Sequence, residues 1–428
     1  MKHHLFIGID RSDASIDTCS LNAAGEITAQ SKINTAPETL LTWVRELEKS
    51  LPAGHTIALC IEQPCQNLIH FFSQFAFLCL YLANPAVIKK YRESLSPSRA
   101  KDDRRDAKAL AQFVYERHVR LQPWSSTDPL ADQIALLAEK RRQLVGIRTS
   151  LTNKLTQALK DSFPQAFQLI GRDIHAPLAR AFLTKWPTLQ AVKNAKPSTI
   201  TQFYHTHGSR RPKVIENRLK IIKNGVPLCT QESALVAYTK LIHALVRQVA
   251  AIQTSIQEFD STIEELSAKH EDVHIFKSLP GAGATFSARL LGFFGSDRTK
   301  YDCASSLQKH SGVAPLTKQS GKMHFVHRRY ACNKFWRQTF VEWAGQSAIK
   351  SLWAKAYYKQ QKDKGHRHQS ILRSLAYKWQ RIIFRCWQNR EEYDESLYLE
   401  ALTKSSSPLI PIINEIRKSN PKFCEQFP

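Results

Sequence analysis

The chain has 428 residues, a formal net charge of +24 and a hydrophobic share of 43%. A chain of this length holds two or three domains with their own cores, and its apolar content excludes a disordered protein. Its excess of Lys and Arg over Asp and Glu favours a nucleic-acid partner over an anionic membrane or an acidic protein.

The cysteines and the N-terminus indicate where in the cell the protein is expected. The nine cysteines are odd in number and include no CxxC pair, which indicates neither a disulfide framework nor a zinc ribbon. The N-terminus runs directly into a strand pattern without a signal segment, and no apolar run is expected to reach transmembrane length. We therefore expect a cytoplasmic, nucleoid-associated protein without a membrane partner.

Residues 1–125 alternate between strand-like and helix-like patterns. Buried or alternating runs predict strands, and apolar residues three or four apart predict helices. The expected elements are strands at 5–9, up to about 22, and 27–33, a helix at 37–50, a strand at 56–61, a helix at 66–75, a strand at 76–82 and a helix at 102–117. Three strands followed by alternating helices and strands predict an α/β domain with the ribonuclease-H-like (RuvC-like) order of elements.

From residue 126 the pattern becomes helical. One apolar stripe begins near Leu130, and a second runs from Leu235 to Leu266. A single helix packed on a core would explain the second stripe alone. The two stripes together predict a coiled-coil linker over 126–270. A small helical insertion is expected at about 162–230, with a basic patch at Arg210, Arg211 and Lys213. Residues 271–400 predict a mostly α C-terminal domain, and 401–428 a weakly structured tail.

Four carboxylates occupy positions that a ribonuclease-H-like sheet would bring together. Asp10 ends the first strand, Glu62 ends a later strand, and Asp103 and Asp106 share one face of a helix. Four oxygen ligands in one cleft suit Mg²⁺, and two such ions ~4 Å apart support phosphoryl transfer. Any one of these residues alone would more often be a helix cap or a solvated charge, as we interpret Asp102.

Two segments of the C-terminal half carry further candidate site residues. Residues 279–283 read Leu-Pro-Gly-Ala-Gly, a turn that resembles a helix-hairpin-helix, with an ordinary helix–helix turn as the equal alternative. Ser320 precedes Gly321 in a loop between cations, which makes it a candidate nucleophile, although a Ser-Gly pair is usually only a turn. The residues expected to contact nucleic acid are Lys101, Arg104, Arg105, Gly281, Gly283, Lys318, Lys322, Arg328 and Arg329.

Together these motifs resemble those of the DEDD-type transposases of bacterial insertion sequences, bridge-RNA-guided serine recombinases related to the pilin-gene invertase. The resemblance rests on Ile9-Asp10, Ile61-Glu62, Asn84-Pro85 and Lys101–Ala107 in one half of the chain, and on residues 279–283, 311–315 and 319–321 in the other. Two positions depart from the family: Asp102 replaces the usual threonine, and Cys332-Asn333 stands where Gly-Asn is usual.

The resemblance implies a ribonuclease-H-like domain joined by a coiled coil to a second, helix-hairpin-helix-like catalytic domain. It implies an acidic tetrad of Asp10, Glu62, Asp103 and Asp106 that binds Mg²⁺, and a nucleophile at Ser320. It also implies homo-oligomers, from dimer to tetramer, with composite active sites, and a structured RNA that selects the element ends and the target DNA.

We therefore expect a DNA transposase or site-specific recombinase that works through a phosphoserine intermediate. Two alternatives remain open. In a metal-dependent Holliday-junction resolvase or nuclease, water would attack and Ser320 would only bind phosphate. A non-catalytic nucleic-acid-binding relative would need neither Asp10 nor Mg²⁺.

Overall fold

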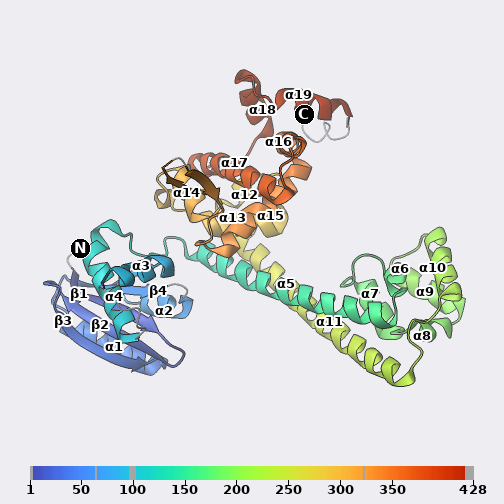
Figure 1. Ribbon diagram of the computed structural model, residues 1–428, viewed down its shortest axis with the longest axis horizontal. Helices are drawn as coiled ribbons and strands as arrows, with labels where there is room; N and C mark the ends of the chain where they lie inside the picture. The colour runs from blue at the N-terminus through green and yellow to red at the C-terminus, as the bar shows by residue number, and fades with distance from the viewer. Residues whose placement is uncertain (1–2, 63–64, 96–102, 322, 420–428) are drawn as a thin grey trace. The chain divides into compact units, whose positions relative to one another are not determined.

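The computed structural model describes residues 3–62, 65–95, 103–321 and 323–419 (Figure 1). The chain divides into two compact units, Met1–Thr127 and Asp128–Pro428. Unit 1 contains the larger sheet, and unit 2 contains the long helices and a helical C-terminal part.

Unit 1 is built on a mixed five-stranded sheet in the order β3-β2-β1-β4-β5. The strands are β1 (His3–Arg11), β2 (Ser15–Asn22), β3 (Ile27–Asn34), β4 (Thr56–Glu62) and β5 (Leu78–Ala83). The β1–β2 and β2–β3 pairs are antiparallel, whereas β1–β4 and β4–β5 are parallel. This order is ribonuclease-H-like and confirms the predicted fold class of the unit.

Helices cover both faces of this sheet, so its central strands are continuous apolar runs. One face packs against α1 (Pro37–Ser50) and α2 (Gln66–Phe72), and the other against α3 (Pro85–Leu95) and α4 (Asp103–Arg117). A 3₁₀ turn, His118–Arg120, follows α4. The sequence predicted no helix at α3, which begins at Pro85 where the Asn84 side chain accepts the Ala86 N–H at 2.9 Å.

Helix α4 crosses β1 at Gly8, where the backbones of the helix and the strand are in contact. A Cβ atom at Gly8 would overlap the carbonyl oxygen of Ala107 and the amide nitrogen of Ala111, and neither backbone atom can rotate away. The absence of a side chain at Gly8 therefore lets α4 lie directly on β1. Asp106 is thereby held on the sheet face that also carries Asp10, the last residue but one of β1.

Gly8→Ala is expected to destabilise unit 1 by about 3 kcal/mol or more, because the new methyl group overlaps helix backbone. Thermal unfolding of the full chain measures this loss. Gly146→Ala is the matched control, because Gly146 is exposed inside a helix with open space around its Cβ position, and it should be neutral or slightly stabilising. Equal melting temperatures for the two variants would contradict the close approach.

Unit 2 begins with two long antiparallel helices, α5 (Pro129–Ser162) and α11 (Glu232–Ala268), each about 50 Å long. The Arg141 guanidinium binds both carboxylate oxygens of Asp260, and Arg148 donates to the Gln253 side chain at 2.7 Å. Arg148 lies seven residues after Arg141, and Gln253 seven residues before Asp260, so one register holds over a heptad. The long helical linker that the sequence predicted is confirmed, and we call it the stalk.

Helix α11 is long and apolar enough, by length and composition alone, to cross a membrane, which the sequence analysis did not anticipate. Its buried residues Ile242, Val249, Ile256 and Ile263 recur every seven positions, as in a helix that packs along another helix. Because α11 also pairs Asp260 with α5, we interpret it as a core helix of the stalk.

The segment between the stalk helices folds into five helices that we call the insertion module. They are α6 (Ala166–Ile170), α7 (Pro177–Lys185), α8 (Leu189–Lys193), α9 (Pro197–Thr206) and α10 (Pro212–Asn224). Aromatic residues such as Phe182 and Trp186 form its core, which closes on α5 through Leu155 and on α11 through Ile242. The end of the stalk next to this segment is therefore capped by a hydrophobic core of its own.

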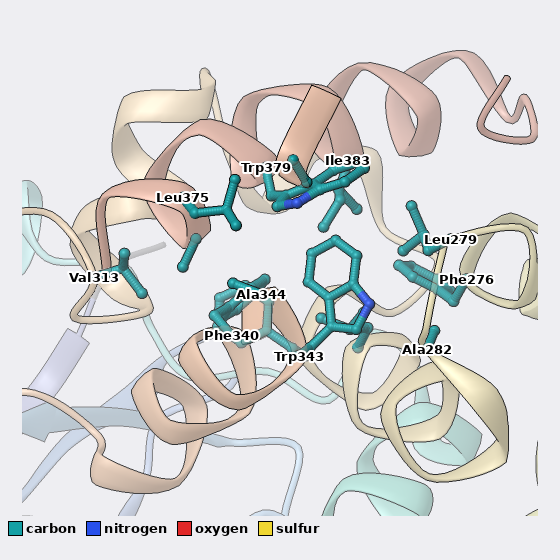
Figure 2. Close-up of a cluster of buried hydrophobic side chains, with 14 of the residues drawn as sticks. Phe276, Leu279, Ala282, Val313, Phe340, Trp343, Ala344, Leu375, Trp379 and Ile383 are labelled. Carbon is teal, nitrogen blue, oxygen red and sulfur yellow. The ribbon is translucent and has the colours of Figure 1, made fainter. Parts of the chain in front are cut away.

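The C-terminal part of unit 2 is mostly helical, as predicted. Its helices are α12 (Val273–Lys277), α13 (Gly283–Phe294), α14 (Ala304–His310), α15 (Lys334–Lys350), α16 (Leu352–Asp363), α17 (His368–Asn389), α18 (Glu395–Lys404) and α19 (Ile410–Ser419), with a 3₁₀ turn at Arg298–Lys300. One hairpin, β6 (Leu316–Ser320) and β7 (Met323–His327), stands among them. In the core, Trp343 of α15 and Trp379 of α17 face one another with ring centroids 4.9 Å apart (Figure 2).

The expected weakly structured tail is wrong over residues 409–419. Helix α19 begins at Ile410, and Leu409, Ile413 and Ile416 are buried in the C-terminal core. The prolines around this segment suggested a break, but Pro411 stands in the first turn, where no backbone N–H is needed. Residues 420–428 lie outside the described residues.

Asp128, which caps α5, ties the stalk to the C-terminal core. Its carboxylate accepts the backbone N–H of Ala131 at 2.9 Å and of Ser296 at 2.7 Å, and lies 2.8 Å from Nε2 of His270. Burial alone would raise the pKa of Asp128, but these hydrogen bonds lower the pKa to about 2. The buried charge thus joins the start of α5, the end of α11 and the end of α13.

Candidate active site

Three of the four predicted acids have described side chains, and all three come to one end of the unit 1 sheet. Asp10 and Glu62 directly follow Ile9 and Ile61, which are partners on the parallel strands β1 and β4. Asp106 projects from α4, which packs on both strands. Asp103 is the first residue of α4, but its side chain lies outside the described part of the chain.

A further carboxylate, which the sequence analysis missed, lies next to Asp10. Asp17 of β2 is the cross-strand partner of Asp10, so the two side chains project from the same sheet face. Asp17 is 5% exposed, and its carboxylate is 4.0 Å from the Lys32 ammonium. The only sequence signal was a charged residue at an inward position of a predicted strand.

The Arg92 guanidinium of α3 lies among these acids. It donates to Asp106, whose side chain is 10% exposed. The hydrogen bond that Arg92 donates to Asp106 raises the pKa of Arg92, partial burial opposes this rise, and the negative charges of Asp106 and Glu62 add to it. Glu62 and Asp106 therefore both act on one positive charge. Arg92 was not predicted, because α3 itself was not predicted.

The donor set fits a divalent cation. Asp10, Glu62 and Asp106 supply only hard oxygen ligands, and Arg92 already places a positive charge against two of the three. Among the residues with described side chains, no group of three or more His, Cys, Asp and Glu is arranged as a metal site. A cation bound through Asp106 would therefore compete with Arg92 for that carboxylate.

Arg92→Met is expected to tighten the binding of Mn²⁺ to the metal-free protein about fivefold, because a competing positive charge is removed. The same variant should lose roughly 1–2 kcal/mol of stability without metal, since the Asp106 carboxylate loses its partner. Calorimetric titration and thermal unfolding measure the two effects. Lys89→Met, an exposed position of α3, is the control and should change neither. Weaker Mn²⁺ binding by Arg92→Met would count against competition.

We call Asp10, Glu62 and Asp106 the acidic cluster, and only some of the predicted cations around it lie within the described residues. Arg104 and Arg105 are exposed in the first turn of α4. Lys101 and Asp102, the predicted cap, lie outside the described residues. The exposed pair places positive charge beside Asp106, where a nucleic-acid phosphate would be attracted.

The turn at residues 279–283 presents two glycines in different roles. Gly281 has φ +73, and a Cβ atom there would lie 2.9 Å from the backbone of Gln346 in α15. Trp343 of α15 also donates its indole N–H to the Pro280 carbonyl at 3.2 Å. Gly283 begins α13 with φ +52 and has nothing within 4 Å of its Cβ position. Gly281 therefore fixes the turn, and Gly283 leaves one side of it open.

The sequence placed Ser320 in a loop, but in the structure it is the last residue of β6. It pairs with Met323 across the hairpin turn, and Gly321 follows with φ +53. Every described residue of the two strands is exposed. Lys318 and its partner Phe325 share the face of Ser320, because side chains two positions apart along a strand lie on one face. The predicted contact residue Lys322 lies outside the described part.

The base of the hairpin is braced by side chains from the same domain. Arg329 donates to the Ala314 carbonyl at 3.4 Å, and Arg337 donates to the Arg329 carbonyl at 2.6 Å. Cys332, one of the family departures, packs against Gly312, where any Cβ atom would overlap its sulfur. Its neighbour Asn333 caps α15 by accepting two backbone N–H groups. Both ends of the hairpin are thus fixed while its tip stays exposed.

A cationic pocket of about 360 Å³ lies at this base. Its lining residues come from the hairpin exit, α15 and α17, and they are Arg328, Lys334, Arg337, Gln338, Val341, Glu342, Gln369 and Arg373. Four cations face one carboxylate, and Glu342 is itself engaged by Arg289 at 3.3 Å. The predicted residue Arg328 is therefore joined by three cations that the sequence analysis did not assign to the site, because they are adjacent only after folding.

Two transposase families match separate parts of this chain. A DEDD model of the IS110 type, described as "Transposase", matches residues 7–164, which contain the four predicted acids. A model described as "Transposase IS116/IS110/IS902 family" matches residues 273–359, which contain Ser320 and most of the pocket. The two matches leave residues 165–272 between them.

Three curated relatives are proteins of insertion sequences or elements. A protein described as "Mini-circle putative transposase for IS117", from Streptomyces coelicolor, is 25% identical over 410 residues, covering 94% of this chain and 98% of its own. An uncharacterized 42 kDa protein of insertion element IS900 from Mycobacterium paratuberculosis is 26% identical over 293 residues, which is 64% of this chain and 68% of its own. A 44.8 kDa protein of IS116 from Streptomyces clavuligerus is 26% identical over 283 residues, with the same coverage.

The matches confirm the resemblance that the motifs suggested. The DEDD match falls on the ribonuclease-H-like unit and its acids, and the second match falls on the helical domain with the exposed serine. A DEDD domain of this kind uses a divalent metal. The chain belongs to the IS110 family of DEDD transposases, which are DNA-cleaving enzymes.

Proposed function

We propose that this transposase cleaves and rejoins DNA strands through a phosphoserine intermediate at Ser320. The observation that carries the proposal is the position of Ser320, exposed at the end of a braced hairpin whose base holds a cationic pocket. The strand between them spans about 15 Å, a few nucleotides along a DNA strand. A strand held in the pocket by its phosphates would therefore present a phosphate to the hairpin tip.

In the proposed step the Ser320 Oγ attacks the phosphorus atom of one phosphodiester. The Oγ–P bond forms, the bond from phosphorus to one deoxyribose oxygen breaks, and that oxygen leaves with a proton. The proton of the serine hydroxyl passes to solvent or to a nearby base. Because one phosphodiester replaces another, attack of a new DNA hydroxyl on the phosphoserine reverses the step and joins strands without ATP.

The acidic cluster of unit 1 supplies the electrostatic part of the proposal. Mg²⁺ held by Asp10, Glu62, Asp103 and Asp106 would supply Lewis-acid stabilisation of the charge that develops on the phosphate. Asp106 would then hold the cation in place of Arg92, and the Arg92 guanidinium would be free to bind the DNA backbone. The exposed Arg104 and Arg105 would orient the strand.

The partners that we propose are DNA, a structured guide RNA and further copies of this chain, from dimer to tetramer. The family resemblance and the net charge of +24 support them. Sequencing the RNA that co-purifies with the protein tests the guide, because one enriched structured species is expected. Light scattering of the purified complex tests the oligomer.

Trapping the covalent intermediate tests the mechanism. A nicked DNA substrate that loses a short strand after cleavage cannot be rejoined, so protein–DNA adducts accumulate and are seen on denaturing gels. Peptide mapping should place the attached nucleotide on Ser320. Free cleaved ends without any adduct would instead support the nuclease alternative, in which water attacks.

A further inference from the structure

The insertion module lies outside both family matches, in the stretch 165–272 that they leave uncovered. Its role therefore does not follow from either match. Residues 162–230 contain eleven Lys and Arg against two acids, Asp173 and Glu216. This excess of positive charge lies on the surface around a hydrophobic core.

Both acids of the module are already engaged inside it. The Asp173 carboxylate lies 2.6 Å from Nδ1 of His175, and the Glu216 carboxylate lies 2.8 Å from the Lys220 ammonium. The remaining cations of the module thus have no carboxylate of their own module to offset them. Their charge is available to a polyanion.

The cations concentrate along α10 and the loop that precedes it. Ile215 and Ile222 bury one side of α10, which leaves its other side to solvent. Apart from Lys220, which is paired with Glu216, the exposed cations of this loop and helix are Arg210, Arg211, Lys213 and Lys223, and we call these four the basic strip. The helix is about 18 Å long, so the strip spans several phosphate spacings of a nucleic-acid backbone.

Arg218 holds the loop part of the basic strip in place. Its guanidinium lies over the Tyr204 ring at 4.3 Å and donates to the Ser209 hydroxyl at 2.8 Å. Ser209 directly precedes Arg210, so the two arginines at the loop are presented from a fixed point. A basic surface of this kind is preorganised, unlike a disordered cationic tail.

The chemistry of the strip selects a double-stranded partner. Proteins that bind single strands stack bases on exposed aromatic rings. In the module the large aromatics Phe163, Phe182, Trp186, Phe203 and Tyr204 are buried in its core, and Phe167 is partly buried against it. The described surface of the basic strip thus offers cations for phosphates without a Phe, Tyr or Trp ring of its own on which a base could stack, as in backbone contacts to a duplex.

The strip lies at the other end of the stalk from the C-terminal core. On α5, Ala138 packs in the C-terminal core and Leu155 packs in the module core, so the two cores are about 25 Å apart along the helix (Figure 1). A contact there would hold DNA well away from Ser320. The strip can therefore contribute affinity without taking part in strand cleavage.

We propose that the basic strip of the insertion module binds the phosphate backbone of duplex DNA, as a contact separate from the site of cleavage. This rests on the chain acting on DNA, but it does not depend on Ser320 as the nucleophile. The strip would add phosphate contacts to every complex, whatever the DNA sequence, and its loss would be felt in affinity and in salt dependence.

Binding of a fluorescent 40-base-pair DNA duplex to the full chain at several salt concentrations tests the proposal. Arg210→Gln/Arg211→Gln should weaken binding about tenfold near 0.15 M salt and reduce the slope of log K against log salt by about 2. Arg210→Lys/Arg211→Lys keeps both charges and should retain most of the affinity, which separates lost charge from misfolding. An unchanged affinity and slope in the Gln variant would overturn the proposal.

The matched control is Arg45→Gln/Lys49→Gln. Both residues are exposed on α1, which covers the sheet face opposite to α4 and the acids, so this variant should bind DNA normally. A loss of affinity for an RNA duplex, with DNA binding unchanged, would overturn DNA as the partner. With saturating DNA, adduct formation by Arg210→Gln/Arg211→Gln should equal that of the unmodified chain, so a failure of the mechanism at Ser320 is seen separately.

Discussion

Asp10→Asn is expected to lower the rate of DNA strand cleavage by about 10³-fold or more. The substitution keeps the size of the side chain but removes one anionic oxygen from the acidic cluster at the end of β1. A divalent cation bound through fewer charges is held less tightly, and it stabilises a pentavalent phosphate less well. Single-turnover cleavage at saturating Mg²⁺ and DNA measures the loss.

The control for this experiment is Asp13→Asn. Asp13 is an exposed residue of the β1–β2 turn, three positions from Asp10, and receives the same chemical change. It should cleave at the normal rate, and both variants should unfold at the temperature of the unmodified chain. Removal of divalent metal by a chelator should reproduce the Asp10→Asn defect. Cleavage by Asp10→Asn at more than a tenth of the normal rate would contradict the proposal that the acidic cluster binds the metal ion needed for cleavage.

Asp17→Asn distinguishes a ligand from a neighbour. Asp17 faces Asp10 across the strands but also lies beside Lys32, so its charge is partly compensated. If Asp17 only contributes to the electrostatic potential at Asp10 without binding the metal ion, its substitution should change the rate of DNA cleavage less than tenfold. A loss as large as that of Asp10→Asn would make it a member of the metal-binding set.

The sheet of unit 1 and the stalk could be predicted because their patterns are long and regular. The run Ile57–Ile61 is apolar throughout because β4 is covered on both faces, and Ile242 to Ile263 keep heptad spacing because α11 packs along one partner. In both cases burial on a single regular element leaves its period in the sequence.

Helix α3 could not be predicted for the opposite reason. Only Ile88 and Tyr91 are buried in it, so two apolar contacts in eleven residues leave almost no period, and its start signal, Asn84-Pro85, is also common in turns. Missing α3 meant missing Arg92. Similarly, the hairpin of Ser320 is exposed on both faces, so no alternation marks its strands.

The acidic cluster shows where reasoning from sequence stops. Asp10, Glu62 and Asp106 could be named because strand ends and helix faces follow from local pattern. Arg92 and Asp17 entered the site only through pairing across strands and between helices. The local sequence pattern predicts which residues one helix or strand presents. Neighbouring charges such as Arg92 and Asp17 depend instead on which helices and strands pack together.

Ser320→Ala is expected to abolish both the covalent protein–DNA adduct and strand joining, with a loss of about 10⁴-fold or more, because no other atom replaces the attacking Oγ. Ser320→Cys keeps a nucleophile at the same place and should retain measurable adduct. Both variants should bind DNA as the unmodified chain does, since Ser320 is exposed at the hairpin end and supports no packing.

Thr317→Ala is the matched control for the serine, because it removes a hydroxyl from the same strand on the opposite face of the hairpin. It should form adduct normally.

If Ser320→Ala cleaves DNA at the normal rate and leaves free ends, water is the nucleophile and the exposed serine only contacts phosphate. If Ser320→Ala and Asp10→Asn each eliminate cleavage while both proteins still bind DNA, the serine and the acids are both required for one reaction. That result would tie the hairpin of unit 2 to the carboxylates of unit 1 by chemistry, independently of how the two units are placed.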